Sequence, residues 1–316
     1  MTDHTSGSVA RHGAASTAAA PTPAVRHDPE EFSFLAAQAE RLGAVVPAAR
    51  RVDAAAPDGA VSAIAYGSGS PRAALLHGAG LNAHTWDATA IALGAPAVAI
   101  DLPGHGDSAW RDDADYTPAT IAPAVARAIE AAADDPVVLV GHSLGGLTAA
   151  AVAAARPELV SHLVLVDITP EIDRGGPSQL RAFYERLEFG SREELVAYAL
   201  SFGLGGDPEN ARRGVHLNSR VRQDGVVEWK HHFARIAAQA LGDDAPADPE
   251  DGWRSLEATT APITLVRGTR GFVDDDAAAR FAARLPSSRT ISLDAPHNVQ
   301  EVAPRDLAAI IRKAIG

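Results

Sequence analysis

Cysteine is missing from this chain of 316 residues. Its absence excludes disulfide bonds, zinc–thiolate and iron–sulfur sites and a thiol nucleophile, but it does not restrict the redox compartment. Long apolar stretches are missing as well. No window approaches the roughly 18 apolar residues that span a bilayer, and residues 1–28 contain no signal-peptide core. We therefore expect a soluble, cytoplasmic protein that begins with a disordered tail over residues 1–28.

Positive charge is scarce. The chain has 28 basic and 40 acidic residues, which gives a net charge of -12 with histidine neutral. Binding to nucleic acid or to an anionic membrane requires clustered lysine and arginine, so this balance argues against both partners. The 46% hydrophobic content is typical of a globular protein, and it leaves the oligomeric state open.

Short apolar runs recur from residue 61 onward, separated by turns and helical stretches. Several are apolar throughout, as strands covered on both faces must be. This alternation predicts an α/β fold with a mostly parallel sheet flanked by helices. The predicted strands are residues 61–66, 73–76, 97–100, 137–140, 163–166, 263–266 and 289–293.

Residues 171–253 depart from this alternation. They contain helical patterns, such as 178–187 and 191–200, no good strand, and eight of the chain's 16 aromatic residues (8 Phe, 4 Trp and 4 Tyr in all). We interpret them as a helical cap inserted into a core formed by residues 29–170 and 254–316. Aromatic side chains commonly line small-molecule pockets, so the cap predicts an apolar small-molecule substrate. The alternative is that these aromatics only pack the cap onto the core.

A Gly-x-Ser-x-Gly motif follows the predicted strand 137–140. It reads Gly-His-Ser-Leu-Gly over residues 141–145 and precedes an alanine-rich helical stretch. In this context the glycines permit a sharp turn that exposes the hydroxyl of Ser143, while the N–H of Leu144 points at a developing oxyanion. Ser143 is therefore the candidate nucleophile, and Leu144 is one candidate oxyanion donor.

Two further segments extend the pattern. Residues 77–80 (His-Gly-Ala-Gly) follow another strand, and the backbone N–H of Ala79 would face that of Leu144 as the second oxyanion donor. Residues 101–108 (Asp-Leu-Pro-Gly-His-Gly-Asp-Ser) follow the next strand. With these motifs in this order, the chain resembles the α/β-hydrolase superfamily over about residues 50–316.

The resemblance implies a Ser-His-acid triad in that chain order, with no cofactor, and a structural role for residues 101–108. His297 lies after the last predicted strand and before an amphipathic helix, where the family's histidine loop falls, and is the candidate base. His231 and His232 could suggest a metal site. Adjacent residues on a helix do not face one site, so we expect no metal there.

The acid has two candidates. In many family members an Asp follows the strand that corresponds to 263–266, but that position here is Gly271. Asp274 comes slightly later and looks more like the opening turn of a helix. Asp167 ends the strand 163–166, and catalytic groups in such sheets lie at the carboxyl ends of the strands. We favour Asp167 and keep Asp274 as the alternative, the structural reading being that Asp167 only caps the turn into the insertion.

These residues predict an esterase-like serine hydrolase that cleaves an ester-like carbonyl bond through an acyl-enzyme intermediate. A serine in place of aspartate at the elbow argues against the family's haloalkane dehalogenase and epoxide hydrolase chemistries. The triad does not separate ester hydrolysis from the family's carbon–carbon bond hydrolases, lyases and cofactor-free oxygenases. A non-catalytic ligand-binding relative is a third hypothesis, which the presence of both Ser143 and His297 disfavours.

Overall fold

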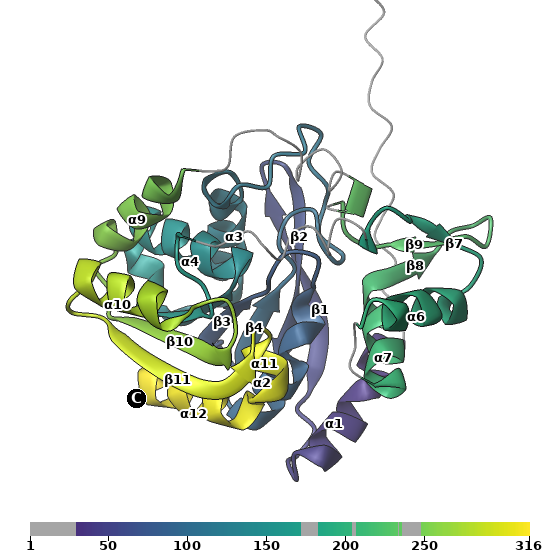
Figure 1. The fold of residues 1–316 in the computed structure, drawn as a ribbon, viewed down its shortest axis with the longest axis horizontal. Coiled ribbons are helices and arrows are strands. Elements are labelled where there is room, and N and C mark those ends of the chain that lie inside the picture. Colours follow the sequence, from purple (N-terminus) through teal and green to yellow (C-terminus); the bar gives the residue numbers. More distant parts are fainter. Residues whose placement is uncertain (1–29, 172–182, 204–206, 233, 236–247) are drawn as a thin grey trace, which may run out of the picture.

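The computed structural model describes residues 30–171, 183–203, 207–232, 234–235 and 248–316. The predicted tail, residues 1–28, lies outside the described residues. The described chain is built around an eight-stranded sheet in the order β1-β2-β4-β3-β5-β6-β10-β11 (Figure 1). Its strands are β1 (Ala49–Ala56), β2 (Gly59–Tyr66), β3 (Ala73–Leu76), β4 (Ala97–Ile100), β5 (Val137–His142), β6 (Val160–Val166), β10 (Ile263–Arg270) and β11 (Arg289–Pro296).

The predicted α/β architecture is confirmed, and each of the seven predicted strands is present. The six strands from β4 to β11 in the sheet order are parallel, whereas β2 pairs antiparallel with both β4 and β1. Strands β3, β4 and β5 are buried along their whole length, which explains their uniformly apolar sequences. The carboxyl ends of the parallel strands meet at one edge of the sheet, and the sequence motifs follow those ends.

Strand β1 is absent from the sequence-based prediction. It lies at the edge of the sheet, antiparallel to β2, and none of its residues is fully buried. Its sequence, Ala-Arg-Arg-Val-Asp-Ala-Ala-Ala, contains no continuous apolar run because only one face packs on the protein. A half-buried edge strand of this composition therefore gives little signal.

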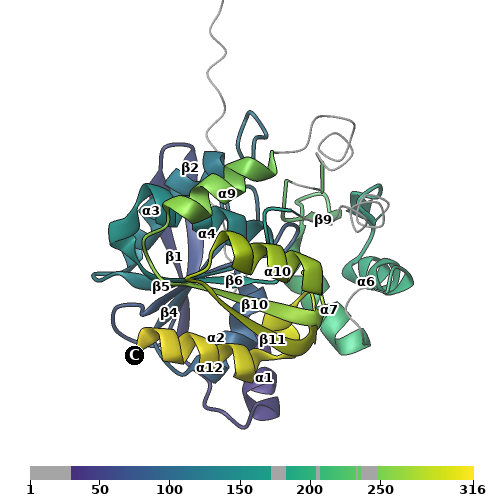
Figure 2. The same cartoon turned by 60° about the vertical axis from the view of Figure 1, so that its left-hand side comes forward.

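Helices cover both faces of the sheet, as Figure 2 shows with the strands between them. One face packs against α3 (Pro118–Ala132), α4 (Leu144–Ala155), α9 (Pro249–Ala258) and α10 (Asp275–Arg284). The other packs against α1 (Leu35–Arg41), α2 (Asp87–Leu93), α11 (Val299–Val302) and α12 (Pro304–Ile315). Three short 3-10 helices are η1 (Glu31–Phe34), η2 (Ala83–Trp86) and η3 (Pro157–Leu159). No helix within the described ranges is long and apolar enough to cross a membrane.

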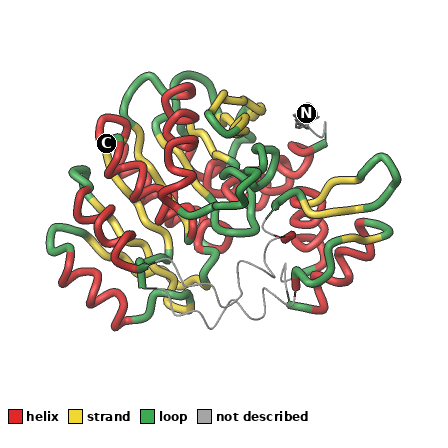
Figure 3. The backbone as a smooth tube through the Cα atoms, turned by 90° about the horizontal axis from the view of Figure 1, so that it is seen from above, coloured by secondary structure: helices red, strands yellow, loops and turns green. Residues whose placement is uncertain are grey.

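The described residues 183–203, 207–232 and 234–235, called the insertion from here on, form a lobe beside the sheet (Figure 3). Its described elements are β7 (Glu188–Phe189), α6 (Arg192–Ser201), α7 (Pro208–Asn218), β8 (Ser219–Val221) and β9 (Val227–Trp229). Helix α6 matches the predicted helix 191–200, while residues 178–182 of the other predicted helix lie outside the described residues. The prediction of an insertion without strands was wrong, because β7, β9 and β8 form a small antiparallel sheet. Strands of two or three residues are too short to show a pattern in sequence.

The aromatic residues of the insertion pack mainly on one another. They form a hydrophobic cluster of their own, separate from the two clusters on the faces of the main sheet. Trp253, predicted from the sequence to belong to the cap, lies outside the insertion on α9 and packs against Phe281 in the core. The predicted cap boundary at residue 253 therefore falls inside a core helix. The cluster comprises Phe183, Tyr184, Phe189, Tyr198, Phe202 and Trp229, so these side chains chiefly hold the insertion together.

Candidate active site

Ser143 lies at the turn between β5 and α4. Its backbone has φ 52° and ψ -122°, a left-handed conformation that costs a non-glycine residue about 1–3 kcal/mol. Helix α4 begins at the next residue, Leu144, whose N–H lies in the first turn and outside the intrahelical hydrogen-bond ladder. The strained turn thus presents the Ser143 side chain beside a helix N-terminus, as the motif predicted.

The loop after β3 passes directly beside this turn. A Cβ on Gly78 would lie 3.2 Å from the Cβ of Ser143. His77 shapes the loop: its Nδ1–H donates to the Gly78 carbonyl at 2.8 Å, and its Nε2 accepts from the N–H of Leu102 at 3.0 Å. Burial lowers the pKa of His77, which keeps this neutral tautomer. Because the Gly78 carbonyl and the Ala79 N–H belong to one peptide plane, His77 also orients the candidate oxyanion donor.

Asp167 and His297 contact each other although they lie 130 positions apart in the sequence. The Nδ1 of His297 lies 2.7 Å from the Oδ2 of Asp167, and the Asp167 side chain is fully buried. Asp167 also has a positive φ of 50°. Among the described residues only three that are not glycine have a positive φ, and two of them are Ser143 and Asp167. Strain of this kind is found at functional sites in folded proteins.

Two backbone groups complete the surroundings of the Asp167 carboxylate. The Gly268 N–H donates to Oδ1 at 3.0 Å and the Phe272 N–H donates to Oδ2 at 2.6 Å. A Cβ on Gly271 would lie only 2.2 Å from Oδ2. The sequence departs from the family pattern at Gly271. The Asp167 carboxylate occupies the space that a side chain at this position would need.

The alternative acid, Asp274, is engaged elsewhere. It is the N-cap of α10, and its Oδ1 accepts from the N–H of Ala277 at 2.7 Å. This is the helix-opening role that its sequence context indicated. Of the two candidate acids, only Asp167 contacts His297.

Two rings contact His297 that the sequence did not point to. Phe272 stacks on its imidazole with the ring centroids 3.7 Å apart and the planes at 16°. His142, which precedes Ser143, packs at 4.4 Å between centroids, and its Nε2 lies 3.1 Å from the His297 carbonyl oxygen. Burial, followed by the neighbouring His297, lowers the pKa of His142 well below its usual range, so its Nε2–H donates to that carbonyl. The departure at Gly271 was the only sequence signal near Phe272.

The comparison with known proteins follows this geometry. The family model described as the alpha/beta hydrolase family matches residues 73–310. The chain belongs to the alpha/beta hydrolase family. Esterase Rv0045c of Mycobacterium tuberculosis is 38% identical over 295 residues, which is 90% of this chain and 95% of that protein. Lipase LipV of the same organism is 30% identical over 277 residues, 79% of this chain and 96% of that one.

Solved structures give the same family. A crystal structure of esterase Rv0045c has a TM-score of 0.73 and 37% sequence identity, covering 90% of this chain and 97% of that one. The structure of E-2-(acetamidomethylene)succinate hydrolase has a TM-score of 0.71 and 26% identity, covering 85% and 99%. This α/β hydrolase is therefore an enzyme of the esterase type.

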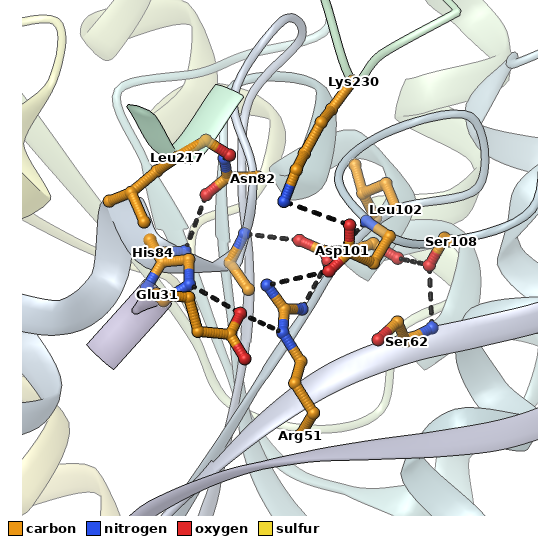
Figure 4. Close-up of polar contacts among 12 residues, drawn as sticks. Glu31, Arg51, Ser62, Asn82, His84, Asp101, Leu102, Ser108, Leu217 and Lys230 are labelled. Atoms are coloured by element: carbon orange, nitrogen blue, oxygen red, sulfur yellow. Dashed lines mark hydrogen bonds and ion pairs between the residues drawn. The ribbon is translucent and has the colours of Figure 1, made fainter. Parts of the chain in front are cut away.

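A buried charge cluster supports the loops of the α/β hydrolase site (Figure 4). Arg51 on β1 donates from Nη1 to Asp101 at 2.6 Å and from Nε to Glu31 at 2.8 Å. Burial opposes ionisation of Asp101, but the Arg51 guanidinium outweighs it and lowers the pKa of Asp101 to about 2. Asp101 in turn accepts from the Ala83 N–H at 2.7 Å, just after the loop of residues 77–80. The charge cluster comprises Glu31, Arg51, His84, Asp87, Asp101, Asp107, Arg213 and Lys230.

The insertion of this α/β hydrolase contacts the same loops. Arg213 on α7 donates to Asp87 at 2.7 Å, and Lys230 lies 3.2 Å from Asp107. The Tyr184 hydroxyl lies 2.5 Å from where a Cβ on Gly80 would be, so the insertion reaches the loop of residues 77–80. These contacts join residues more than 100 positions apart, which local sequence patterns cannot reveal.

His231 and His232 face different partners. His231 is buried against Tyr184, whereas His232 stacks on Trp110 and its Nδ1 accepts a hydrogen bond from the Tyr116 hydroxyl at 2.8 Å. Burial lowers the pKa of His231 to about 3. Within the described ranges no group of three or more His, Asp or Glu side chains is arranged to hold a metal ion.

A cavity of about 460 Å³ lies between β1, β2 and α3. Its walls include Pro71 and Ala97, which lie at the amino ends of β3 and β4. Ser143 follows the carboxyl end of β5, at the opposite end of the parallel strands. The cavity is therefore not part of the candidate active site.

Proposed function

We propose that this α/β hydrolase is a serine esterase that cleaves small, predominantly apolar carboxylic esters through an acyl-enzyme intermediate, with Ser143 as nucleophile, His297 as base and Asp167 as acid. The observation that carries the proposal is the 2.7 Å contact between His297 and Asp167. It lies beside the strained turn of Ser143, since His142 of that turn contacts His297. The names esterase and lipase of two relatives support the same reaction class.

The proposed reaction has two halves. In the first, the Ser143 oxygen forms a bond to the ester carbonyl carbon as its proton passes to Nε2 of His297. The carbon–oxygen bond to the alcohol then breaks, and the alcohol leaves with that proton. In the second half, water gives a proton to His297 as its oxygen bonds to the acyl carbon. The bond between that carbon and the Ser143 oxygen then breaks, Ser143 takes the proton back from His297, and the acid is released.

Two groups of contacts assist these steps. Asp167 accepts the Nδ1–H of His297 and thereby keeps Nε2 free to take the proton from Ser143. The N–H groups of Ala79 and Leu144 would donate to the oxygen of the tetrahedral intermediate, where each such donor typically contributes about 2.7–4 kcal/mol. His77 supports the first donor by holding the peptide plane to which the Ala79 N–H belongs.

A serine-directed fluorophosphonate probe and hydrolysis of p-nitrophenyl butyrate test the nucleophile. We expect labelling and hydrolysis in the wild type, and a loss of both in Ser143→Ala, with activity reduced at least about 1,000-fold. Ser255→Ala, on the surface of α9, is the matched control and should behave as the wild type. Labelling of folded Ser143→Ala, or a wild type that is never labelled, would overturn the proposal.

A panel of methyl esters from acetate to hexanoate tests the substrate class. We expect kcat/KM to rise with acyl chain length, since each buried methylene contributes up to about 0.8 kcal/mol. A preference for small polar esters would contradict the apolar assignment. Efficient turnover of a carbon–carbon cleavage substrate, with no ester hydrolysis, would move the protein to another reaction of the family.

A further inference from the structure

The side chain of Phe272 is unusually placed for an aromatic residue. It follows the end of β10 and remains 53% exposed, although its ring lies flat on the imidazole of His297. Large apolar side chains normally bury most of their surface, and Phe272 does not contribute to any of the three hydrophobic clusters. Its ring therefore has one face on the proposed base and a large remaining surface open.

The backbone fixes this position. The Phe272 N–H donates to Oδ2 of Asp167 at 2.6 Å, and the same oxygen lies 2.7 Å from Nδ1 of His297. Val273, the next residue, is buried and anchors the chain on the other side. Because Phe272 and His297 are held by one carboxylate oxygen, their stacked arrangement is set by the site itself.

The geometry also says what the open surface faces. Nδ1 of His297 points to Asp167, so Nε2 lies on the far edge of the five-membered ring. In the proposed reaction, Nε2 delivers a proton to the alcohol as it leaves. Because the ring centroids are only 3.7 Å apart and the planes lie at 16°, the wider phenyl ring covers the imidazole out to this edge, beside the place where the alcohol takes up its proton.

We propose that the ring of Phe272 forms a wall of the subsite for the alcohol part of the ester, and that it favours aromatic over small aliphatic alcohols. This rests on the proposed function, because it needs His297 as the group that protonates the alcohol. The ring acts on the alcohol side alone, so it leaves selectivity for the acyl part unchanged.

Two series of esters test the proposal. The alcohol series holds butyrate constant and compares methyl, cyclohexylmethyl and benzyl esters, three primary alcohols of similar reactivity as leaving groups. The acyl series holds methanol constant and compares acetate, butyrate and hexanoate. The variants are Phe272→Leu, which removes the ring, and Phe272→Tyr, which keeps it. Val221→Ala removes an equally exposed apolar side chain on β8 and is the control.

We expect the wild type to prefer the benzyl over the methyl ester. In Phe272→Leu the ratio of the two kcat/KM values should fall about 3- to 10-fold, the usual contribution of one aromatic pair. The ratio should persist in Phe272→Tyr and Val221→Ala. The ratios of kcat/KM among the three methyl esters of the acyl series should change less than about twofold in every variant.

A uniform loss across both series in Phe272→Leu would overturn the proposal, since it would mean that the ring only supports His297. An unchanged benzyl-to-methyl ratio would also overturn it. Labelling by the fluorophosphonate probe separates the two hypotheses: an unlabelled wild type refutes the proposed function, whereas a labelled, active enzyme with an unchanged ratio refutes only the wall. Phe272→Tyr keeps the test available if Phe272→Leu does not fold.

Discussion

Three donors meet on the carboxylate of Asp167: the imidazole of His297 and the backbone N–H groups of Gly268 and Phe272. A buried carboxylate held by several donors keeps its orientation. It also fixes which ring nitrogen of His297 carries the proton at rest. Which ring nitrogen of His297 carries the proton thus depends on the loop at the end of β10.

The first prediction at this scale compares the two acids. Asp167→Asn should lower kcat by a factor on the order of 100 to 10,000, because an amide no longer selects the productive tautomer of His297. Asp274→Asn should change kcat less than about twofold, since asparagine still caps α10. Steady-state kinetics on one ester measures both. The reverse ranking would assign the acid to Asp274.

The second prediction concerns Gly271. Gly271→Ala places a methyl group 2.2 Å from the Asp167 carboxylate oxygen, so the carboxylate must turn away from His297. We expect kcat to fall at least about tenfold with little change in thermal stability. Gly214→Ala, where a Cβ meets nothing within 4 Å, is the control. Because both changes act on the same carboxylate, Asp167→Asn combined with Gly271→Ala should cost less than the product of the single effects. Independent effects would show that Gly271 acts elsewhere.

Local residue patterns indicated three segments of the candidate site. The elbow, the His-Gly loop and the loop of His297 each have a local signature, and the structure places all three at one edge of the sheet. The choice between Asp167 and Asp274 has no local signature, because it depends on which strand end lies next to His297. Phe272 could not be assigned either, since its contact with His297 joins two loops 25 residues apart.

At the scale of elements, the described part of the insertion has its own hydrophobic cluster and is joined to the core by ion pairs, hydrogen bonds and ring contacts. Four carboxylates of the charge cluster, Glu31, Asp87, Asp101 and Asp107, face Arg51, Arg213, Lys230 and His84. Burial alone would lower the pKa of His84, but Asp87 and Glu31 outweigh it and raise that pKa. With His84 protonated, the described cluster has four charges of each sign. Two of its cations, on Arg213 and Lys230, come from the insertion.

This arrangement predicts the effect of removing one cation. Arg213→Ala should lower the free energy of unfolding by about 3 kcal/mol, because the fully buried Asp87 loses one of its partners. Arg41→Ala removes a more exposed ion pair with Glu209, also on α7, and should cost less than about 0.5 kcal/mol. Urea denaturation measures both. Equal, small effects would mean that the cluster does not hold the insertion to the core.

Whether a strand could be predicted from the sequence depended on its surroundings in the fold. Strands covered on both faces were predicted because burial on both sides requires a continuous apolar sequence, as in β3 and β4. The edge strand β1 and the short strands β7 to β9 were missed because half-buried or very short strands carry polar residues. The ion pair of Arg51 with Asp101 spans 50 residues and leaves no periodic trace.

At the scale of the whole molecule, we expect the buried histidines to set how folding stability changes in mildly acidic solution. Burial lowers the pKa of His77, His105, His142 and His231, whereas only His84 among the fully buried histidines of the described chain has a raised pKa. A lowered pKa means that the unfolded chain binds a proton that the folded chain does not, once the pH falls below about 6.5. His84 acts in the opposite direction: its contribution is present below about pH 6.5 and is lost as the pH rises through its folded-state pKa.

Four buried histidines have a lowered pKa and one has a raised pKa. We therefore expect the free energy of unfolding to fall as the pH drops from about 6.5 towards 5. Urea denaturation at several pH values measures the slope. His231→Phe should be less stable at pH 7.5, because the Ala234 N–H loses its acceptor. It should also lose stability less steeply between pH 6 and 5, by up to about 1.4 kcal/mol per pH unit for the one proton removed. An unchanged slope would show that His231 does not contribute to acid sensitivity.

The neighbouring strands β6 and β10 also limit how this protein can change through successive mutations. A carboxylate at residue 271 and one at residue 167 would claim the same space, because even a Cβ at Gly271 meets Asp167 within 2.2 Å. A descendant sequence cannot first acquire a spare acid after β10 and later discard the proposed acid, Asp167, after β6. Each single step gives either two crowded carboxylates or none, so moving the acid between the strands requires two changes and an impaired ancestor between them.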